Sequence, residues 1–155
     1  GSLPVLQSHL NTYNGLYSLY FEKVHLACAA ASPGDIKSLV PGVSLTAIRF
    51  CQYPVGFYVK KENPRNIREF SDLTRADIIF ANREKGSSRR IFLDRKLMEY
   101  GISPDSISGY RNELVSDSFT AAAVAGGQAD AALGESCAAR SFPYLDFIPL
   151  SQETM

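Results

Sequence analysis

A chain of 155 residues is long enough for one sizeable domain or for two small lobes that share a core. Its 16 basic and 16 acidic residues cancel, and this balance argues against a general nucleic-acid or membrane-surface binder. Hydrophobic residues make up 45% of the chain, an ordinary share for a soluble globular protein, and no apolar run is long enough to span a bilayer. We therefore expect no membrane contact.

The cysteines and histidines are few and scattered. Cys28, Cys51 and Cys137 lie far apart and are odd in number, so the sequence has neither a disulfide framework nor a zinc-binding spacing. We expect three buried free thiols and hence a cytoplasmic protein; a periplasmic or extracellular protein that has lost a signal peptide is the alternative. His25 lies in an apolar run, which predicts a core histidine. We expect no metal and no cofactor.

The first third of the chain contains short apolar runs. Residues 5–10 and 25–29 are predicted strands, and residues 16–21 form a predicted helix with apolar side chains at helical spacing. We expect the two strands to lie together in a first sheet.

A longer apolar and β-rich stretch follows. Residues 43–50 and 56–59 read as two strands in line, and Gln52-Tyr53-Pro54 interrupts them. Two strands in line with a break between them indicate a connection between sheets. We therefore expect residues 50–56 to cross from the first sheet to a second one.

A strand, a polar loop and a helix start follow one another at the centre of the chain. The predicted strand 78–81 leads through residues 82–90 into an amphipathic helix, residues 91–100, which Gly101 ends. The first N–H groups of a helix lack internal partners and its dipole favours negative charge, so this arrangement suits an anion. The candidate ligand contacts in this loop are Arg83, Gly86, Ser87, Ser88 and Arg89. The alternative is a capped helix start with solvated basic residues.

Helices and strands continue to alternate, which predicts an α/β fold with mostly parallel sheets. A short helix is predicted at residues 66–73, and an alanine-rich helix at 121–125 is capped by Ser116 or Asp117. The strands expected in the second, parallel-rich sheet are residues 78–81, 129–133 and 147–150.

In such sheets ligands bind beyond the carboxyl ends of the strands, at helix N-termini. Three predicted helix starts are rich in small polar residues: 11–15, 86–90 and 116–118. They add further candidate ligand-binding residues, together with one aromatic: Asn11, Thr12, Tyr110, Ser116 and Asp117.

Each of these candidates also has a structural interpretation. Thr12 can cap a helix from Tyr13 onward, and Asp117 is first of all a helix cap. Tyr110 is expected to be a packed aromatic with a satisfied hydroxyl. Two further side chains are expected to be structural: Arg90, paired with Glu113, and Asp130, which caps or pairs near the sheet.

Several motifs occur together in a fixed order. They are Asn82-Arg83-x-x-Gly86-Ser87-x-x-Arg90 with Leu93-Asp94, Gly109-Tyr110-x-x-Glu113, and Gly127-x-Ala129-Asp130-Ala131-x-Leu133-Gly134. This ordered set, spread over about residues 11–153, resembles a PBP-like substrate-binding domain family. The resemblance implies a type II periplasmic-binding-protein fold, in which two α/β lobes close over a small ligand, and a relation to molybdate- and tungstate-binding proteins. Such domains are often attached to helix-turn-helix regulators or to molybdopterin-biosynthesis proteins, so we expect nucleic-acid contact only through an attached domain.

The sequence departs from the family pattern at several positions. The replacements are Asn11-Thr12 for Gly-Ser, Ala30 for His, Tyr53 for Arg, Ser88-Arg89 for Gly-Thr, and Ser116-Asp117 for Thr-His. From the resemblance we also expect the family's first strand–helix unit to lack a counterpart in this sequence. We expect an incomplete first lobe with the crossing strand in residues 1–52, and a second lobe with the anion-binding loop in residues 53–155.

The sequence thus predicts a non-catalytic domain that binds or senses a small oxyanion, such as molybdate or tungstate, or a small organic acid. The alternative is a degenerate domain without a ligand that serves as an interaction or oligomerisation module; the apolar surface of an incomplete lobe would suit a homodimer. A carboxylate in the pocket disfavours a dianion. Asp117→Asn is therefore predicted to tighten dianion binding with little loss of stability.

Overall fold

The structure is a computed structural model that describes residues 4–155. One five-stranded sheet has the order β3-β2-β4-β1-β5. Its strands are β1 (Gln52–Lys60), β2 (Phe80–Arg83), β3 (Glu113–Leu114), β4 (Ala131–Glu135) and β5 (Leu145–Thr154). Strand β2 is parallel to β3 and β4, whereas β1 is antiparallel to β4 and β5. The sheet is therefore mixed: β1 runs opposite to the other four strands, which all point the same way, as expected for a mostly parallel α/β fold.

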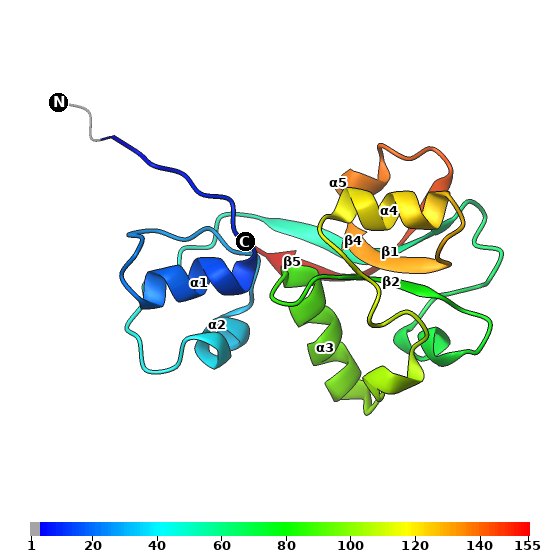
Figure 1. The fold of residues 1–155 in the computed structure, drawn as a ribbon, viewed down its shortest axis with the longest axis horizontal. Coiled ribbons are helices and arrows are strands. Elements are labelled where there is room, and N and C mark those ends of the chain that lie inside the picture. Colours follow the sequence, from blue (N-terminus) through cyan, green and yellow to red (C-terminus); the bar gives the residue numbers. More distant parts are fainter. Residues whose placement is uncertain (1–3) are drawn as a thin grey trace.

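Helices cover both faces of this sheet (Figure 1). On one face lie α3 (Ser88–Tyr100) and the 3-10 helices Phe70–Thr74 and Pro104–Ser106; on the other lie α4 (Asp117–Ala125) and α5 (Ser136–Ala139). Side chains alternate along a strand, so neighbouring residues of β1 pack against the helices on opposite faces of the sheet. Phe57 packs in the core on the α3 face, and Tyr58 packs in the core on the α4 face. Both are fully buried.

Two further helices, α1 (Thr12–Tyr20) and α2 (Pro33–Leu39), lie together beyond one end of the sheet (Figure 1). The predicted strands 5–10 and 25–29 do not form, and the first sheet expected from them is not present in residues 4–155. Leu6 and Leu26 are 98% and 84% exposed. A strand needs a ladder partner and a buried face, and these segments have neither.

The predicted break at residues 52–54 is also wrong, since they belong to β1, whereas residues 43–50 form no strand. Pro54 is tolerated for a topological reason. Strand β5 pairs with β1 from Gln52, but β4 pairs with it only from Val55 onward. At Pro54 the strand therefore has a neighbour on one side only, as a residue without an N–H requires.

The long helix α3 agrees with the prediction. Ser87 caps its start, and Gly101 ends it in the left-handed conformation with φ 64°. The predicted helix 66–73 is replaced by the shorter 3-10 helix, because Asn63 binds the backbone N–H and C=O of Ile67 and sets up a turn instead.

The free cysteines are exposed rather than buried, and His25 is exposed rather than in the core. Both expectations for the residues before β1 fail because the apolar runs that contain them are not packed. Within residues 4–155, no helix combines the length and the apolar character that crossing a membrane requires.

Candidate functional site

Charged side chains converge where β2 and β4 end. Arg83 ends β2, Glu135 ends β4, Arg89 is the second residue of α3, Asp117 is the first residue of α4, and Tyr53 lies near the start of β1. We call these five residues the arginine cluster. The carboxyl ends of parallel strands and the N-termini of the following helices meet at one edge of a sheet, which is where ligands bind in α/β folds.

Arg89 is at the centre of the cluster and is only 3% exposed. Its Nε donates to Asp117 Oδ2 at 3.3 Å, its Nη2 donates to the Glu135 carboxylate, and its Nη1 donates to the Tyr53 hydroxyl at 3.4 Å. The guanidinium also lies 5.0 Å from the centre of the Tyr53 ring. Burial disfavours the charged form, but Asp117, Tyr53 and Glu135 together more than compensate, so the pKa of Arg89 stays above its ordinary value.

Asp117 links the two arginines. Its carboxylate accepts from Arg83 Nη1 and Arg89 Nε, and its Oδ2 also accepts from the backbone N–H of Glu135 at 3.2 Å. Ser116, not Asp117, caps α4 through the N–H of Phe119 at 3.1 Å. The interpretation of Asp117 as a helix cap is therefore wrong, because its carboxylate turns toward the guanidinium groups.

Two guanidinium groups in this network face three carboxylates, since Arg83 also binds Glu84 at 2.9 Å. With all groups ionised, the linked set carries one excess negative charge. Like charges repel, so this balance works against a bare dianion at the cluster.

Glu135 is a member of the cluster that the sequence interpretation missed. Its side chain is 30% exposed, and its Oε2 accepts from the thiol of Cys137 at 3.1 Å. This hydrogen bond raises the pKa of Cys137 above its ordinary value. The Tyr58 hydroxyl donates to the backbone carbonyl of Glu135 at 2.8 Å, and burial raises the pKa of Tyr58. Its position in the sequence could have identified it. Glu135 lies just after the predicted strand 129–133, as Arg83 lies just after the predicted strand 78–81.

The N-terminus of α1 rests on the loop before α3. Tyr13 N donates to Gly86 O at 2.9 Å, and Asn11 Nδ2 donates to Lys85 O at 3.3 Å. Gly86 has φ 87°, and a side chain there would place its Cβ 2.9 Å from Tyr13 Cβ. Gly86 is therefore needed both for its backbone conformation and for this close approach.

The hydroxyls predicted for the site are partly used as caps. Asn11 rather than Thr12 caps α1, through the N–H of Asn14 at 2.9 Å. Thr12 is the first residue of α1 and is half-buried. Ser87 is 2% exposed and its Oγ accepts from Arg90 N at 3.2 Å, while Ser88 is half-buried at the first position of α3.

Tyr110 belongs to a second cluster. Its hydroxyl donates to Asp94 at 2.6 Å, and the guanidinium of Arg90 lies 4.1 Å from the centre of its ring. Arg90 also pairs with Glu113 at 3.1 Å. The structural interpretations of Tyr110 and Arg90 are confirmed, and these side chains hold α3 against the segment before β3. The structure brings the three predicted helix starts together, since Asn11 contacts the Gly86 loop, and Asp117 contacts Arg89.

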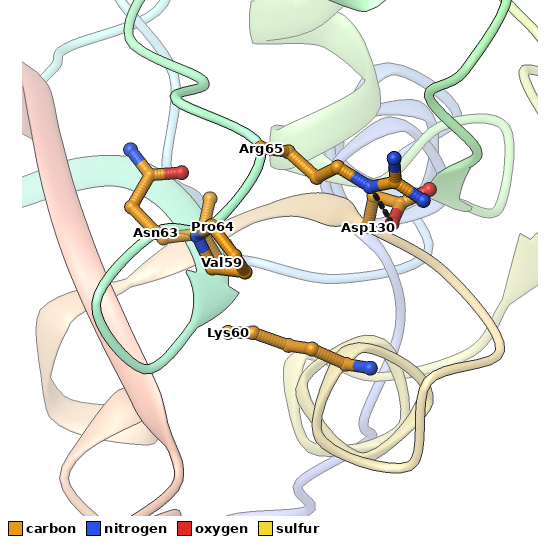
Figure 2. A pocket seen from close by; sticks show the side chains of 6 residues that line it. All are labelled: Val59, Lys60, Asn63, Pro64, Arg65 and Asp130. Atoms are coloured by element: carbon orange, nitrogen blue, oxygen red, sulfur yellow. Dashed lines mark hydrogen bonds and ion pairs between the residues drawn. The ribbon is translucent and has the colours of Figure 1, made fainter.

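Two hollows lie away from this cluster. Figure 2 shows one of about 100 Å³ at the opposite end of the sheet, lined by Val59, Lys60, Asn63, Pro64, Arg65 and Asp130. There Asp130 binds Arg65 Nε at 3.3 Å and the N–H of Ile79 at 2.9 Å, which confirms its structural role. A more open hollow of about 330 Å³ lies beside residues 104–112. The ion pair in the first hollow is solvated, since the side chain of Arg65 is 50% exposed, whereas that of Arg89 in the arginine cluster is only 3% exposed. Among residues 4–155, no group of three His, Cys, Asp or Glu side chains is placed to hold a metal ion.

Comparison with known proteins gives a consistent assignment. A family model described as a PBP superfamily domain matches residues 1–155. The chain is 38% identical over 157 aligned residues to the uncharacterized protein YvgK of Bacillus subtilis, covering 96% of this chain and 50% of that protein. It therefore spans about half the length of this curated relative.

Two solved structures show the same fold. ArgBP from T. maritima, as a mutant, has a TM-score of 0.66 at 17% identity, covering 96% of this chain and 60% of that protein. The substrate-binding protein AbpA of an amino acid ABC transporter from Streptococcus pneumoniae, bound to L-arginine, has a TM-score of 0.59 at 19% identity, covering 94% and 61%. The fold is thus that of type II periplasmic binding proteins, of which this chain represents part of the two-lobed arrangement. The chain belongs to the PBP superfamily of substrate-binding domains, a fold that binds small ligands.

Proposed function

We propose that this chain is a non-catalytic ligand-binding domain whose arginine cluster receives a small zwitterion, with an amino acid as the simplest example. The observation that carries the proposal is that the guanidinium group of Arg89 binds two carboxylates, those of Asp117 and Glu135. The side chain of Glu135 is still 30% exposed. An ammonium group can bind Glu135 from the solvent side. The ligand's own carboxylate can then take the place of Glu135 on a guanidinium group.

A zwitterion fits this charge balance better than a dianion. The linked groups carry an excess negative charge, so a ligand that brings its own cation removes the repulsion. A dianion such as molybdate would have to displace Asp117 or Glu135 and leave that carboxylate unpaired. The protein with L-arginine bound among the solved relatives supports the same ligand class, at the level of fold.

Binding without catalysis agrees with the chemistry of the nearby side chains. The pKa values of the Cys137 thiol and the Tyr58 hydroxyl are both raised, so both groups stay protonated near neutral pH. A protonated thiol or phenol is a poor nucleophile or base.

An oxyanion is the second candidate ligand. The observation in its favour is the buried start of α3, where Arg89 and Arg90 are only 3% and 4% exposed and the loop supplies free helix N–H groups. A protonated oxyanion or a hydroxy acid has an O–H group that can donate a hydrogen bond to the Asp117 or Glu135 carboxylate. A dianion has no such donor.

A domain without a ligand that acts as an interaction or oligomerisation module is the third candidate. In the described part of the chain, every buried side-chain nitrogen or oxygen has a hydrogen-bond partner, so the cluster is complete without a ligand. Large apolar side chains are exposed on the residues before β1, and these could pair two copies of the chain.

Calorimetry with the whole chain distinguishes the three candidates. The panel contains L-arginine, L-glutamate and L-alanine, against molybdate, tungstate and sulfate. We expect binding of at least one amino acid, and a loss of about tenfold or more in Glu135→Gln, which removes the ammonium partner. Glu113→Gln is the matched control, because that carboxylate pairs with Arg90 in the second cluster.

Other outcomes of the same titrations would overturn the proposal. Binding of the dianions alone would support the oxyanion site. Binding of none, together with a molecular mass that rises with concentration, would support the interaction module.

A further inference from the structure

The third arginine of helix α3, Arg95, joins three distant segments. Arg95 lies six residues beyond Arg89, about 9 Å further along the helix axis at 1.5 Å per residue. Its Nη1 donates to Asp35 Oδ2 at 2.5 Å and to Ser32 Oγ at 3.0 Å, and its Nη2 donates to Glu153 Oε1 at 2.9 Å. One guanidinium group thus connects α2, α3 and β5.

The carboxylates that Arg95 binds are better buried than Arg95 itself. The side chains of Asp35 and Glu153 are 11% and 8% exposed, whereas that of Arg95 is 27% exposed. Two poorly solvated carboxylates bound to one guanidinium group repel each other when that group is removed. Arg95 attracts both carboxylates and so holds α2 near β5. Without Arg95, only the repulsion between Asp35 and Glu153 would remain.

Asp35 also fixes the start of α2. Ser32 and Asp35 form a capping box, in which the Ser32 hydroxyl accepts from Asp35 N at 3.1 Å and Asp35 Oδ2 accepts from Ser32 N at 3.1 Å. The side chains of Ser32 and Asp35, which Arg95 binds, are therefore fixed to the first turn of α2. A contact of this kind positions a whole helix.

Residues 11–40 are held to the rest of the chain at few points. Among the residues that the structure describes, hydrogen bonds connect residues 11–40 with residues 52–155 at two places. One is the contact of Arg95 with Ser32 and Asp35; the other is the contact of Asn11 and Tyr13 with the Gly86 loop. Because α1 and α2 pack against each other, fixing α2 at Arg95 also holds α1 over that loop.

We propose that Arg95 is a positioning residue that holds residues 11–40 over the ligand-binding edge of the sheet. It keeps the N-terminus of α1 on the Gly86 loop and so sets ligand affinity without touching the ligand. The effect on affinity rests on the proposed function. The effect on the position of α1 does not.

Amide hydrogen exchange of the full chain tests the positional part. In Arg95→Met, the Tyr13 amide, which donates to Gly86 O, is expected to exchange about tenfold faster or more, while the amides of the β1–β4 ladder keep their protection. Lys96→Met is the matched control, since Lys96 pairs with Glu99 at 2.6 Å on the same helix. It should leave Tyr13 unchanged. Arg95→Lys keeps the charge and should restore part of the protection.

Two results would overturn the positional role. The first is Tyr13 exchange in Arg95→Met that is as slow as in the parent protein. The second is an equal rise at Tyr13 and in the β1–β4 ladder, which would mean that Arg95 only stabilises the whole fold.

Titration with L-arginine tests the effect on affinity. We expect the affinity to fall about tenfold in Arg95→Met and to stay unchanged in Lys96→Met. Equal affinity in Arg95→Met despite faster Tyr13 exchange would overturn the link between position and affinity. If the parent protein binds L-glutamate or L-alanine but not L-arginine, the same titration is made with that amino acid. A parent protein that binds none of the three would count against the proposed function, and the exchange experiment would then decide the positional role alone.

Discussion

Residues 52–155 and residues 4–51 have comparable apolar runs but very different packing. In the later region, strand β4 pairs with β2 on one side and with β1 on the other, and helices cover both faces of the sheet. In the earlier region, the predicted strands have no partner, and many large apolar side chains face the solvent: Val5, Leu6, Leu26, Ile48 and Phe50. Strand propensity therefore becomes a strand only where a neighbouring strand and a covering layer are present.

The same contrast separates the two kinds of site residue. Side chains attached to the sheet, such as Arg89 and Asp117, are held by several hydrogen bonds each and lie in fixed positions. Asn11 and Thr12 lie on the smaller unit, which reaches the site through few contacts. Changes in the two regions should therefore have effects of very different size.

The largest expected effect is in the core of the later region. Phe57→Ala removes a fully buried ring that packs edge-on against Phe70 with centroids 5.3 Å apart, and it should lower the free energy of unfolding by about 3–5 kcal/mol. Ile48→Ala, at a side chain that is 82% exposed, should change it by less than about 0.5 kcal/mol. Urea unfolding measures both. Equal losses would mean that residues 4–51 pack in solution.

A smaller effect is expected at the arginine cluster. Asp117→Asn removes a carboxylate that binds both Arg83 and Arg89, so we expect it to destabilise the fold by about 2 kcal/mol. This replaces the expectation of little loss, which treated Asp117 as a cap. The freed guanidinium groups should bind sulfate or molybdate more tightly than in the parent. Calorimetry that shows no gain in dianion affinity would remove Asp117 from the ligand site.

Loss of a helix cap comes next. Ser87→Ala leaves the N–H of Arg90 without its partner and should cost about 1 kcal/mol of unfolding free energy. Ser88→Ala is the control, since that hydroxyl lies one position beyond the cap, and it should be close to neutral. If Ser87→Ala instead weakens ligand binding without changing stability, then Ser87 is a ligand contact rather than a cap.

The smallest effect concerns the thiol beside Glu135. The hydrogen bond to Glu135 raises the pKa of Cys137, so the folded state favours the protonated thiol. The resulting stability is present below the ordinary thiol pKa and is lost as pH rises through the raised one. In a Cys28→Ser, Cys51→Ser background, alkylation of Cys137 should need a higher pH than alkylation of a free thiol. Glu135→Gln should shift that profile to lower pH, and an unshifted profile would show that the hydrogen bond does not form in solution.

The sequence by itself determined those elements whose ends and periodicity are set by residues only a few positions apart. Helix α3 follows from a capping serine, an apolar stripe and Gly101, because caps and helical spacing act over a few residues. The polar loop after residues 78–81 and the helix starts at Asn11, Gly86 and Ser116 were predictable for the same reason.

Tertiary structure alone decided which strands formed and which side chains met. Residues 5–10 and 25–29 have strand-like composition, but pairing depends on partners far away in the chain, and β1 passes through Pro54 because β4 begins to pair only at Val55. Glu135 joined the site because β4 ends beside β2. Asp117 left its expected capping role because folding placed two guanidinium groups within its reach, and the buried guanidinium of Arg89 needs a carboxylate partner, whereas Ser116 is available to cap the helix.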